Sequence, residues 1–279
     1  AAKAESEEAT IIGNVEVTGV QFSGSSVSAV ETNRGTIQTD YVVVGSGPWI
    51  NTFWKMLDLP SKINVRNGDT IHEGVQMWRY YCLQEGTLGV DPKMLTTNEG
   101  EMPPVIHVDS DAPLYSDIDG SMITDKMWGI YYKPDFSFDG VQGGAAPYDV
   151  NGADENFSVD PYGTESPDFV VGKDFIDMWC AALAFCQKRF EDTRHLYRNE
   201  HASGGLGALA PDSFPVFDVY RENCYVIADS NHGYKMLGVG KLVAAEIMGE
   251  SSRLLEPFRF SRFEEGKLHP VSNSPFPWS

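Results

Sequence analysis

The sequence predicts an α/β fold in which a layer of antiparallel strands is inserted between two strand–turn–helix units. The first unit is a short β-branched run, Tyr41–Val44 (YVVV), followed by a Gly-Ser-Gly-Pro turn and then by helical spacing. The second is Cys224–Ala228 (CYVIA), which also precedes a turn and a helix. Such units usually meet in one parallel sheet. The stretch between them has strand-like runs rich in Trp and Tyr, which favour a separate sheet.

The first third of the chain is expected to hold part of a helix, a meander and a second helix. Ala1–Glu8 is rich in helix formers but has no N-cap before it, so we interpret it as the end of a helix that began upstream. Alternating runs punctuated by glycine predict three antiparallel strands, at Val15–Phe22, Ser26–Thr32 and Thr36–Thr39. Pro48 suits the first turn of a helix, and a helix is expected over Trp49–Leu57.

The rest of the chain is expected to contain a second sheet and two helices. Its strands are predicted at Val75–Leu83, Pro104–Asp109 and Met127–Lys133. Lys173–Arg194 places apolar residues on one stripe and predicts the clearest helix. A last helix is expected from about Gly240 to Met248, with Gly249 as its C-cap.

Charge and cysteine content narrow the class of partners. The formal net charge is −19 over 279 residues, which argues against nucleic acid or an anionic membrane surface as a partner. No apolar run is long enough to cross a bilayer. The four cysteines form no CxxC pair, so we expect buried, reduced thiols in a cytoplasmic protein. The six histidines show no HxxxH or HExxH spacing, so no metal site is expected.

Lys235, in the turn after Cys224–Ala228, has the clearest chemical implication. It stands just before a predicted helix start, where the helix macrodipole disfavours a cation. Its position suggests a nearby anion, either a substrate carboxylate or a negatively charged cofactor. The alternative is a lysine that simply extends into solvent.

Four blocks of sequence carry a resemblance to a known family. Tyr225–Gly240 (YVIADSNHGYKMLGVG) is similar to a flavin-contacting segment with a GHGFK-like motif, and Gly13–Trp49 ends in VVVGSGPW, similar to a VVVAAGPW-like motif. Gly129–Gly144 resembles a substrate-sheet hairpin, and Gly205–Asp218 resembles a TPDGxPxIG-like strand. The blocks occur in family order over nearly the whole chain. On these residues the chain resembles the D-amino-acid oxidase/sarcosine oxidase family of FAD-dependent oxidoreductases.

The resemblance implies a Rossmann-like FAD-binding domain and an antiparallel-sheet substrate domain. Residues 1–68 would form part of the FAD-binding domain, residues 69–200 the substrate-binding sheet with its helix, and residues 201–279 the return to the FAD-binding domain and a tail. The family's GxGxxG loop lies before the point where this sequence begins, and no GxGxxG occurs here. A companion N-terminal part is therefore expected. It would be a product of proteolytic processing, a separately encoded subunit or a segment omitted from this sequence.

The resemblance also implies roles for individual residues. Near the ADP part of FAD would lie Gly45, Ser46 and Gly47; along the flavin ring would lie Gly233, Tyr234, Lys235 and Met236. Lys235 would pair with the substrate carboxylate, and Tyr132 matches a pocket tyrosine. Gln142 stands where sarcosine oxidases have a lysine that promotes reaction with oxygen. Gly205 stands where some members tether FAD through a cysteine, so FAD is expected to be non-covalent.

The implied reaction is oxidation of the C–N bond of a small amine or amino acid, sarcosine-, N-methyl- or D-amino-acid-like, by hydride transfer to flavin N5. One alternative is an FAD dehydrogenase that passes electrons to an acceptor other than oxygen. Another is a non-catalytic subunit of a heteromeric flavoenzyme. The sequence leaves the substrate and the electron acceptor open.

Overall fold

The computed structural model describes residues 1–103, 105–145, 171–201, 203–228 and 236–269. Its internal contacts divide the chain into two compact units. Of the described residues, the first unit holds 1–77, 215–228 and 236–267, and the second holds 268–269 and those within 78–214. Residues 78–214, which form most of the second unit, are thus an insertion in the sequence of the first.

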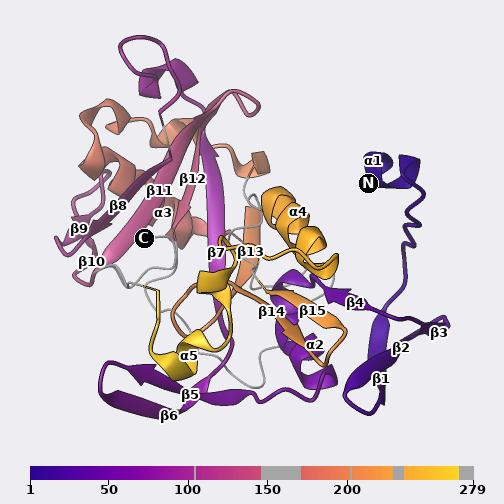
Figure 1. The fold of residues 1–279 in the computed structure, drawn as a ribbon. Helices are drawn as coiled ribbons and strands as arrows, with labels where there is room; N and C mark the ends of the chain where they lie inside the picture. The colour runs from indigo at the N-terminus through magenta and orange to yellow at the C-terminus, as the bar shows by residue number, and fades with distance from the viewer. Residues whose placement is uncertain (104, 146–170, 202, 229–235, 270–279) are drawn as a thin grey trace. The chain divides into compact units, whose positions relative to one another are not determined.

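Three small sheets make up the described β-structure of the first unit (Figure 1). Their strands are β1 (Val17–Ser23), β2 (Ser26–Thr32), β3 (Gly35–Gln38), β4 (Val42–Val44), β5 (Lys62–Asn67), β6 (Thr70–Gln76), β14 (Val216–Tyr220) and β15 (Cys224–Ala228). An antiparallel meander has the order β1-β2-β3, and β5 pairs with β6 as a hairpin. In the third sheet, of order β14-β15-β4, β14 is antiparallel to β15 and β4 is parallel to it. The predicted meander and the predicted parallel pairing are both confirmed.

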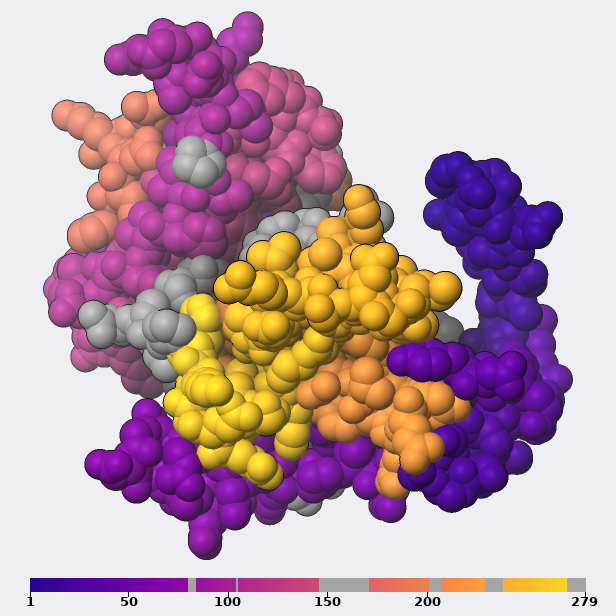
Figure 2. All heavy atoms as spheres, in the orientation of Figure 1, coloured from indigo at the N-terminus to yellow at the C-terminus, as the bar shows by residue number. Residues whose placement is uncertain are grey.

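Two helices pack on opposite faces of the β14-β15-β4 sheet. The helical segments of this unit are α1 (Ala2–Ser6), η1 (Gly47–Trp49), α2 (Ile50–Met56), α4 (Met236–Ile247), η9 (Glu256–Phe258) and α5 (Arg262–Glu265). Tyr225 of β15 lies in a buried cluster with Val243 of α4. Tyr220 of β14, whose side chain points to the other face, meets Trp54 of α2 edge to face with ring centroids 5.0 Å apart. Figure 2 shows the yellow atoms of the segment that begins with α4 lying against the orange atoms of β14 and β15.

The second unit is built on a five-stranded antiparallel sheet. Its strands, in spatial order, are β13 (Ser203–Leu209), β7 (Arg79–Leu88), β12 (Gly140–Ala145), β11 (Trp128–Asp135) and β8 (Ile106–Ser110). Two further strands, β9 (Leu114–Tyr115) and β10 (Met122–Thr124), lie between β8 and β11 in the sequence. They pair with each other as a separate antiparallel two-stranded sheet. The helical segments are α3 (Lys173–Cys186), η2 (Pro92–Leu95), η5 (Lys188–Phe190), η6 (Arg194–Leu196) and η7 (Asn199–His201).

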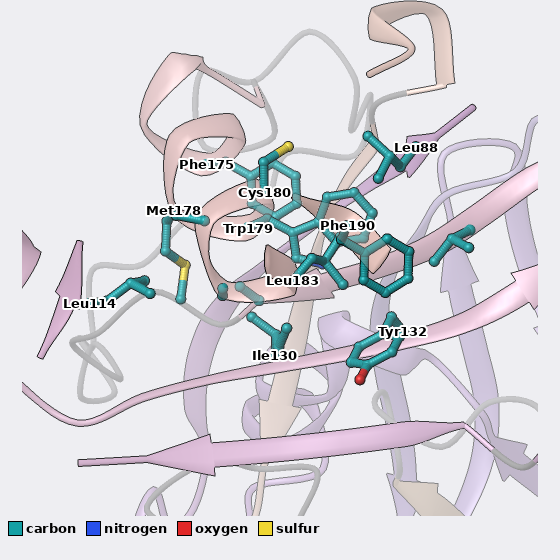
Figure 3. Close-up of a cluster of buried hydrophobic side chains, with 14 of the residues drawn as sticks. Leu88, Leu114, Ile130, Tyr132, Phe175, Met178, Trp179, Cys180, Leu183 and Phe190 are labelled. Carbon is teal, nitrogen blue, oxygen red and sulfur yellow. The ribbon is translucent and has the colours of Figure 1, made fainter. Parts of the chain in front are cut away.

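Helix α3 covers one face of this sheet and forms the larger core (Figure 3). Its buried stripe includes Phe175, Met178, Trp179 and Leu183. Ile130 and Tyr132 of β11 project toward it. Each such side chain contributes about 1.5–3 kcal/mol when fully buried. Because strand residues alternate between faces, the odd-numbered residues of β11 lie on the face opposite to α3.

Helix α3 is shorter than the sequence predicts. The apolar spacing predicts a helix to Arg194, but α3 ends at Cys186 and Gln187 is extended, with φ −144° and ψ 120°. The side chain of Gln187 donates to the Tyr132 hydroxyl at 2.8 Å, and Phe190 is buried from a separate 3-10 turn. Tertiary contacts thus override a helical pattern that local propensity would continue.

Two other element boundaries differ from the prediction. The predicted strand Val75–Leu83 is divided, since β6 ends at Gln76 and β7 begins at Arg79. Helix α4 begins at Met236, before the predicted start near Gly240. Glycines at 238 and 240 hide this first turn in the sequence, because glycine is a poor helix former.

The described cysteines are free thiols, as the sequence predicts. Cys180 and Cys224 are buried, and these two residues and Cys186 carry free thiols. Burial raises the pKa of Cys180 to about 12, and those of Cys186 and Cys224 to about 11. Over the described ranges, no helix combines the length and the apolarity that a membrane span would need.

Candidate functional site

The two sequence segments expected to bind the cofactor follow two neighbouring strands. Val42, Val43 and Val44 of β4 are the parallel partners of Cys224, Tyr225 and Val226 of β15. Parallel strands have their carboxyl ends at the same edge of the sheet, which is where ligands bind in open α/β sheets. The turn at Gly45–Gly47 therefore starts at the same sheet edge as the segment that leads from β15 to α4.

The turn after β4 leaves room for a ligand. An added Cβ atom at Gly45 or at Gly47 would meet no atom within 4 Å. Gly47 has φ +55°, a left-handed conformation that favours glycine. The Oγ atom of Ser46 is buried and has no hydrogen-bond partner in the described structure. A buried orphan hydroxyl between two open glycines fits the approach of a polar group such as the ADP part of FAD.

The second turn lies outside the described residues, and so do Gly233, Tyr234 and Lys235. The helix that follows is described from Met236, whose backbone starts α4. Its twelve residues are long enough to direct a positive dipole end toward the sheet edge.

A charged network fixes the other end of α4. Glu246 accepts hydrogen bonds from the Tyr225 hydroxyl at 2.7 Å and from Arg259. Arg259 also donates to the carbonyl of Phe217 at 2.6 Å. Burial opposes ionisation of Glu246, but the hydrogen bonds from Arg259 and Tyr225 outweigh it and hold its pKa below the usual value. The network therefore anchors the C-terminal end of α4 to β15, the strand that leads to the predicted cofactor site.

Tyr132 lies in the core of the second unit. It is 1% exposed, its hydroxyl accepts the hydrogen bond from Gln187, and its ring meets Phe190 edge to face. Burial raises its pKa, which the Gln187 hydrogen bond partly offsets. Tyr132 thus lies on the sheet face that α3 covers, where it packs in the core.

The neighbouring tyrosine, Tyr131, faces the opposite side and joins a polar cluster. Its hydroxyl donates to Oε1 of Glu85 on β7, and the side-chain amide of Gln142 on β12 donates to Oε2 of Glu85 at 3.3 Å. The three side chains come from three strands, and all are half-buried. The ring of His107 on β8 stacks on Tyr131 at 5.8 Å. We name Glu85, Tyr131 and Gln142 the carboxylate cluster.

A glycine lets Tyr131 reach across the sheet. Gly144 is the β12 residue that pairs with Tyr131 on one side and with Glu85 on the other. An added Cβ atom at Gly144 would lie 2.9 Å from the Tyr131 hydroxyl oxygen and 2.4 Å from the carbonyl oxygen of Gln84. Only a residue without a side chain permits the tyrosine to cross β12 and bind a residue two strands away.

His107, Lys133 and Asp135 lie on the same sheet face as Tyr131. Partial burial lowers the pKa of His107, although Asp109 opposes the shift. The imidazole is therefore largely neutral at neutral pH. Lys133, two residues along β11 from Tyr131, is paired with Asp135.

The sequence points to Tyr132 and Gln142 but gives no direct sign of Glu85, Tyr131 or His107. Period-two alternation in β11 is a signal that separates Tyr131 from Tyr132. Glu85 could not be found in this way, because only the register of β7, β12 and β11 brings it to Tyr131. Trp78, directly before β7, is buried at 4% exposure.

One surface pocket lies elsewhere on the second unit. It has a volume of about 350 Å³ and is lined by Tyr115, Phe185, Asp117, Glu191 and Asp192, with two alanines of α3. It contains none of the predicted site residues, and Asp117 is already paired with Arg194. Among the described residues, no three His, Cys, Asp or Glu side chains are grouped to hold a metal ion.

Comparison with known proteins identifies the fold. No protein-family profile and no curated protein sequence matches the chain. Among solved structures, L-proline dehydrogenase from P. horikoshii is 20% identical with a TM-score of 0.60, over 96% of this chain and 59% of that protein. Glycine oxidase from Geobacillus kaustophilus is 16% identical with a TM-score of 0.54, over 89% and 52%. A modified fructosyl peptide oxidase from Aspergillus nidulans is 15% identical with a TM-score of 0.51, over 87% and 50%.

These likenesses concern the fold, and the chain spans only about half to three-fifths of the length of the matched structures. Within that span the described elements are a mixed α/β arrangement with several antiparallel sheets. The chain has the fold of part of the D-amino-acid oxidase family of FAD oxidoreductases.

Proposed function

We propose that the protein, together with a part that supplies a dinucleotide-binding loop, oxidises the C–N bond of a small amine that carries a carboxylate. The observation that carries this proposal is the parallel pairing of β4 with β15. It brings the Gly45–Gly47 turn and the segment leading to α4 to one sheet edge. The names of the matched structures, a proline dehydrogenase and a glycine oxidase, support amino acids as the substrate class.

FAD is the cofactor that these residues fit. Bound FAD would supply the two-electron acceptor for the oxidation. Gly45 and Gly47 would let the backbone approach its ADP part, and the buried Ser46 hydroxyl would find there the partner that it lacks. FAD would bind non-covalently, because Gly205 stands where some members of the family have the cysteine that tethers it.

The chain's own residues would bind and orient the substrate. Lys235, directly before α4, would hold the substrate carboxylate, and the N-terminus of α4 would favour negative charge beside it. Tyr132 would shape the pocket from behind, through its contacts with Gln187 and Phe190. Gly233, Tyr234 and Met236 would line the flavin ring. A neutral amine needs no further general base before C–N oxidation.

The edge position of β4 supports a companion part. β4 lies at one end of the β14-β15-β4 order, and Val43 is 48% exposed. Parallel strands are normally covered on both faces and extended by neighbours. A further parallel strand beside β4, from the part with the GxGxxG loop, would pair with the backbone edge that β4 presents.

One alternative function has specific support, and a second is disfavoured. Gln142 in the carboxylate cluster, in place of a lysine, favours a dehydrogenase that delivers electrons to an acceptor other than oxygen. A non-catalytic subunit would keep the fold but would need no cation at the start of α4, so Lys235 argues against it.

The test is an anaerobic visible absorption spectrum of the natively purified protein, before and after addition of N-methyl and D-amino acids. Bleaching of a flavin band by one of them is the expected result. A flavin band that none of them bleaches would overturn the proposed substrate class. Protein without flavin, with its companion part present, would favour the non-catalytic subunit. Lys235→Met should weaken substrate binding while FAD stays bound, and an unchanged Michaelis constant would contradict the role of Lys235.

A further inference from the structure

The pocket of the second unit combines residues from the end of α3 with residues from β9, which packs against this helix. Tyr115 of β9 and Phe185 of α3 both line it. Met122 of β10 is the cross-strand partner of Tyr115, and Ile118 lies in the turn that joins the two strands. All four residues are more than half exposed. Large apolar side chains that gather at one exposed place mark sites of contact with other proteins.

The ring of Phe185 is exposed but held in place. It meets the ring of Trp128 edge to face, with centroids 5.5 Å apart. Trp128 is fully buried in the core of the unit, and its Nε1 atom donates to the carbonyl of Ala112 at 2.8 Å. Phe185 therefore offers a fixed aromatic ring at the pocket, and the face of such a ring attracts cations.

The three charged residues that line the pocket are all acidic: Asp117, Glu191 and Asp192. Asp117 is paired with Arg194, whose guanidinium also binds Asp177. Glu191 and Asp192 are exposed, and neither forms an ion pair within the part of the chain that the structure describes. The two basic residues of η5 do not line the pocket. The pocket therefore combines aromatic rings with negative charge.

We propose that this pocket is a docking site for another protein and that it receives an arginine side chain of that partner. A guanidinium group stacks on aromatic rings and pairs with carboxylates. The ring of Phe185 and the carboxylates of Glu191 and Asp192 together suit this side chain, and a volume of about 350 Å³ has room for it. The exposed residues of the β9–β10 hairpin would contact apolar residues beside the arginine.

Charge selects the kind of partner. A second copy of this chain would bring a net charge of −19 toward a surface that is itself acidic. Like charges placed against one another oppose association, whereas a basic segment is attracted. The occupant is therefore a basic polypeptide and not a second copy. The docking site is separate from the residues assigned to the oxidation, none of which lines the pocket.

Fluorescence anisotropy with two labelled pentapeptides tests the proposal on the natively purified protein. Each peptide has leucines on both sides of its central residue and glycines at its ends. The central residue is arginine in one peptide and citrulline, a neutral side chain of similar shape, in the other.

Two variants change the pocket. Phe185→Leu keeps an apolar side chain but removes the ring. The double variant Glu191→Gln/Asp192→Asn removes two charges, and asparagine suits the left-handed backbone of Asp192, with φ 61°. The matched control is Glu99→Gln/Glu101→Gln, which removes the same charge from an exposed loop of the same unit.

We expect wild-type protein and the control to bind the arginine peptide about fivefold or more tightly than the citrulline peptide at low salt. Glu191→Gln/Asp192→Asn should reduce this preference to below about twofold. Phe185→Leu should weaken binding of the arginine peptide by about two- to fivefold. Because the carboxylates are exposed, the preference should shrink as the salt concentration is raised to about 0.5 M.

Equal affinity of wild-type protein for the two peptides would overturn the proposal, and so would an unchanged preference in Glu191→Gln/Asp192→Asn. An equal loss of preference in Glu99→Gln/Glu101→Gln would also overturn it, because the general negative charge of the chain would then account for binding. Acetylarginine amide is the last probe. If this small cation binds as tightly as the arginine peptide, the assignment of a protein partner is wrong.

Discussion

The carboxylate of Asp212 accepts a hydrogen bond from the backbone N–H of His269 at 3.2 Å, across 57 positions of sequence. Its other oxygen accepts one from the N–H of Phe214, whose ring stacks on His269 with centroids 3.7 Å apart. Arg79 completes the group through its electrostatic interaction with Asp212. All four residues belong to the second unit, in segments that begin or end beside residues 77, 214 and 267. Asp212 therefore ties together three segments of the second unit that are far apart in the sequence.

Replacing Asp212 should destabilise the protein strongly. Asp212 is only 7% exposed, so Asp212→Ala would remove the acceptor of two backbone N–H groups and the negative charge that interacts with Arg79. We expect the free energy of unfolding to fall by about 2–4 kcal/mol in urea denaturation. Asp111→Ala, on an exposed residue of the same unit, should change it by less than about 0.5 kcal/mol. Equal losses in the two variants would contradict the tie.

Gly144 should tolerate no side chain. The Cβ atom of Gly144→Ala would lie 2.4 Å from the Gln84 carbonyl oxygen, which belongs to the backbone and cannot move aside cheaply. We expect a loss of about 1–3 kcal/mol in the free energy of unfolding. Gly13→Ala, which meets nothing within 4 Å, is the control and should be nearly neutral. A stable Gly144→Ala protein with Tyr131 still bound to Glu85 would refute the geometry of the carboxylate cluster.

The sequence predicts the elements of this protein better than it predicts their ends. Short β-branched runs identify β4 and β15, and glycine-punctuated alternation identifies the meander, because each signal is local. The position at which α3 ends is not determined by a local signal. It depends on Gln187 reaching Tyr132 and on Phe190 filling the core from a separate turn.

The candidate site divides in the same way. The turn at Gly45–Gly47 is visible as a glycine pattern after a strand. The carboxylate cluster is not, because Glu85 and Tyr131 are 46 positions apart and meet only through the register of three strands. A single-residue shift of β12 would remove Gly144 from between them.

Acid should weaken the anchor of α4. Hydrogen bonds from Arg259 and Tyr225 hold the pKa of Glu246 below its ordinary 4.5 despite burial. A folded-state pKa below the unfolded one means that the unfolded chain binds more protons, so the stabilisation is present above 4.5 and is lost as pH falls through the folded value. Glu246→Gln should cost about 1–3 kcal/mol at neutral pH.

The pH dependence distinguishes this effect from a general loss of stability. The difference in unfolding free energy between wild type and Glu246→Gln should shrink as the pH is lowered from about 7 to about 3.5. Glu256→Gln, on an exposed glutamate of η9, serves as the control. A difference that stays constant over this range would show that the charge of Glu246 does not stabilise the fold.

Ser46 should matter for the cofactor and not for the fold. Its buried Oγ atom has no partner in the described structure, so Ser46→Ala removes no hydrogen bond to a described residue and should leave the unfolding free energy of the FAD-free protein within about 0.5 kcal/mol of wild type. If the hydroxyl binds a charged group of FAD, its loss should weaken FAD binding by about tenfold or more, since hydrogen bonds to charged groups contribute about 1.5–3 kcal/mol. Fluorescence titration with FAD measures the affinity, and Ser137→Ala, on an exposed turn of the second unit, is the control. Unchanged FAD affinity in Ser46→Ala would remove the hydroxyl from the cofactor site. A large loss of stability in the FAD-free variant would mean instead that Ser46 has a structural partner.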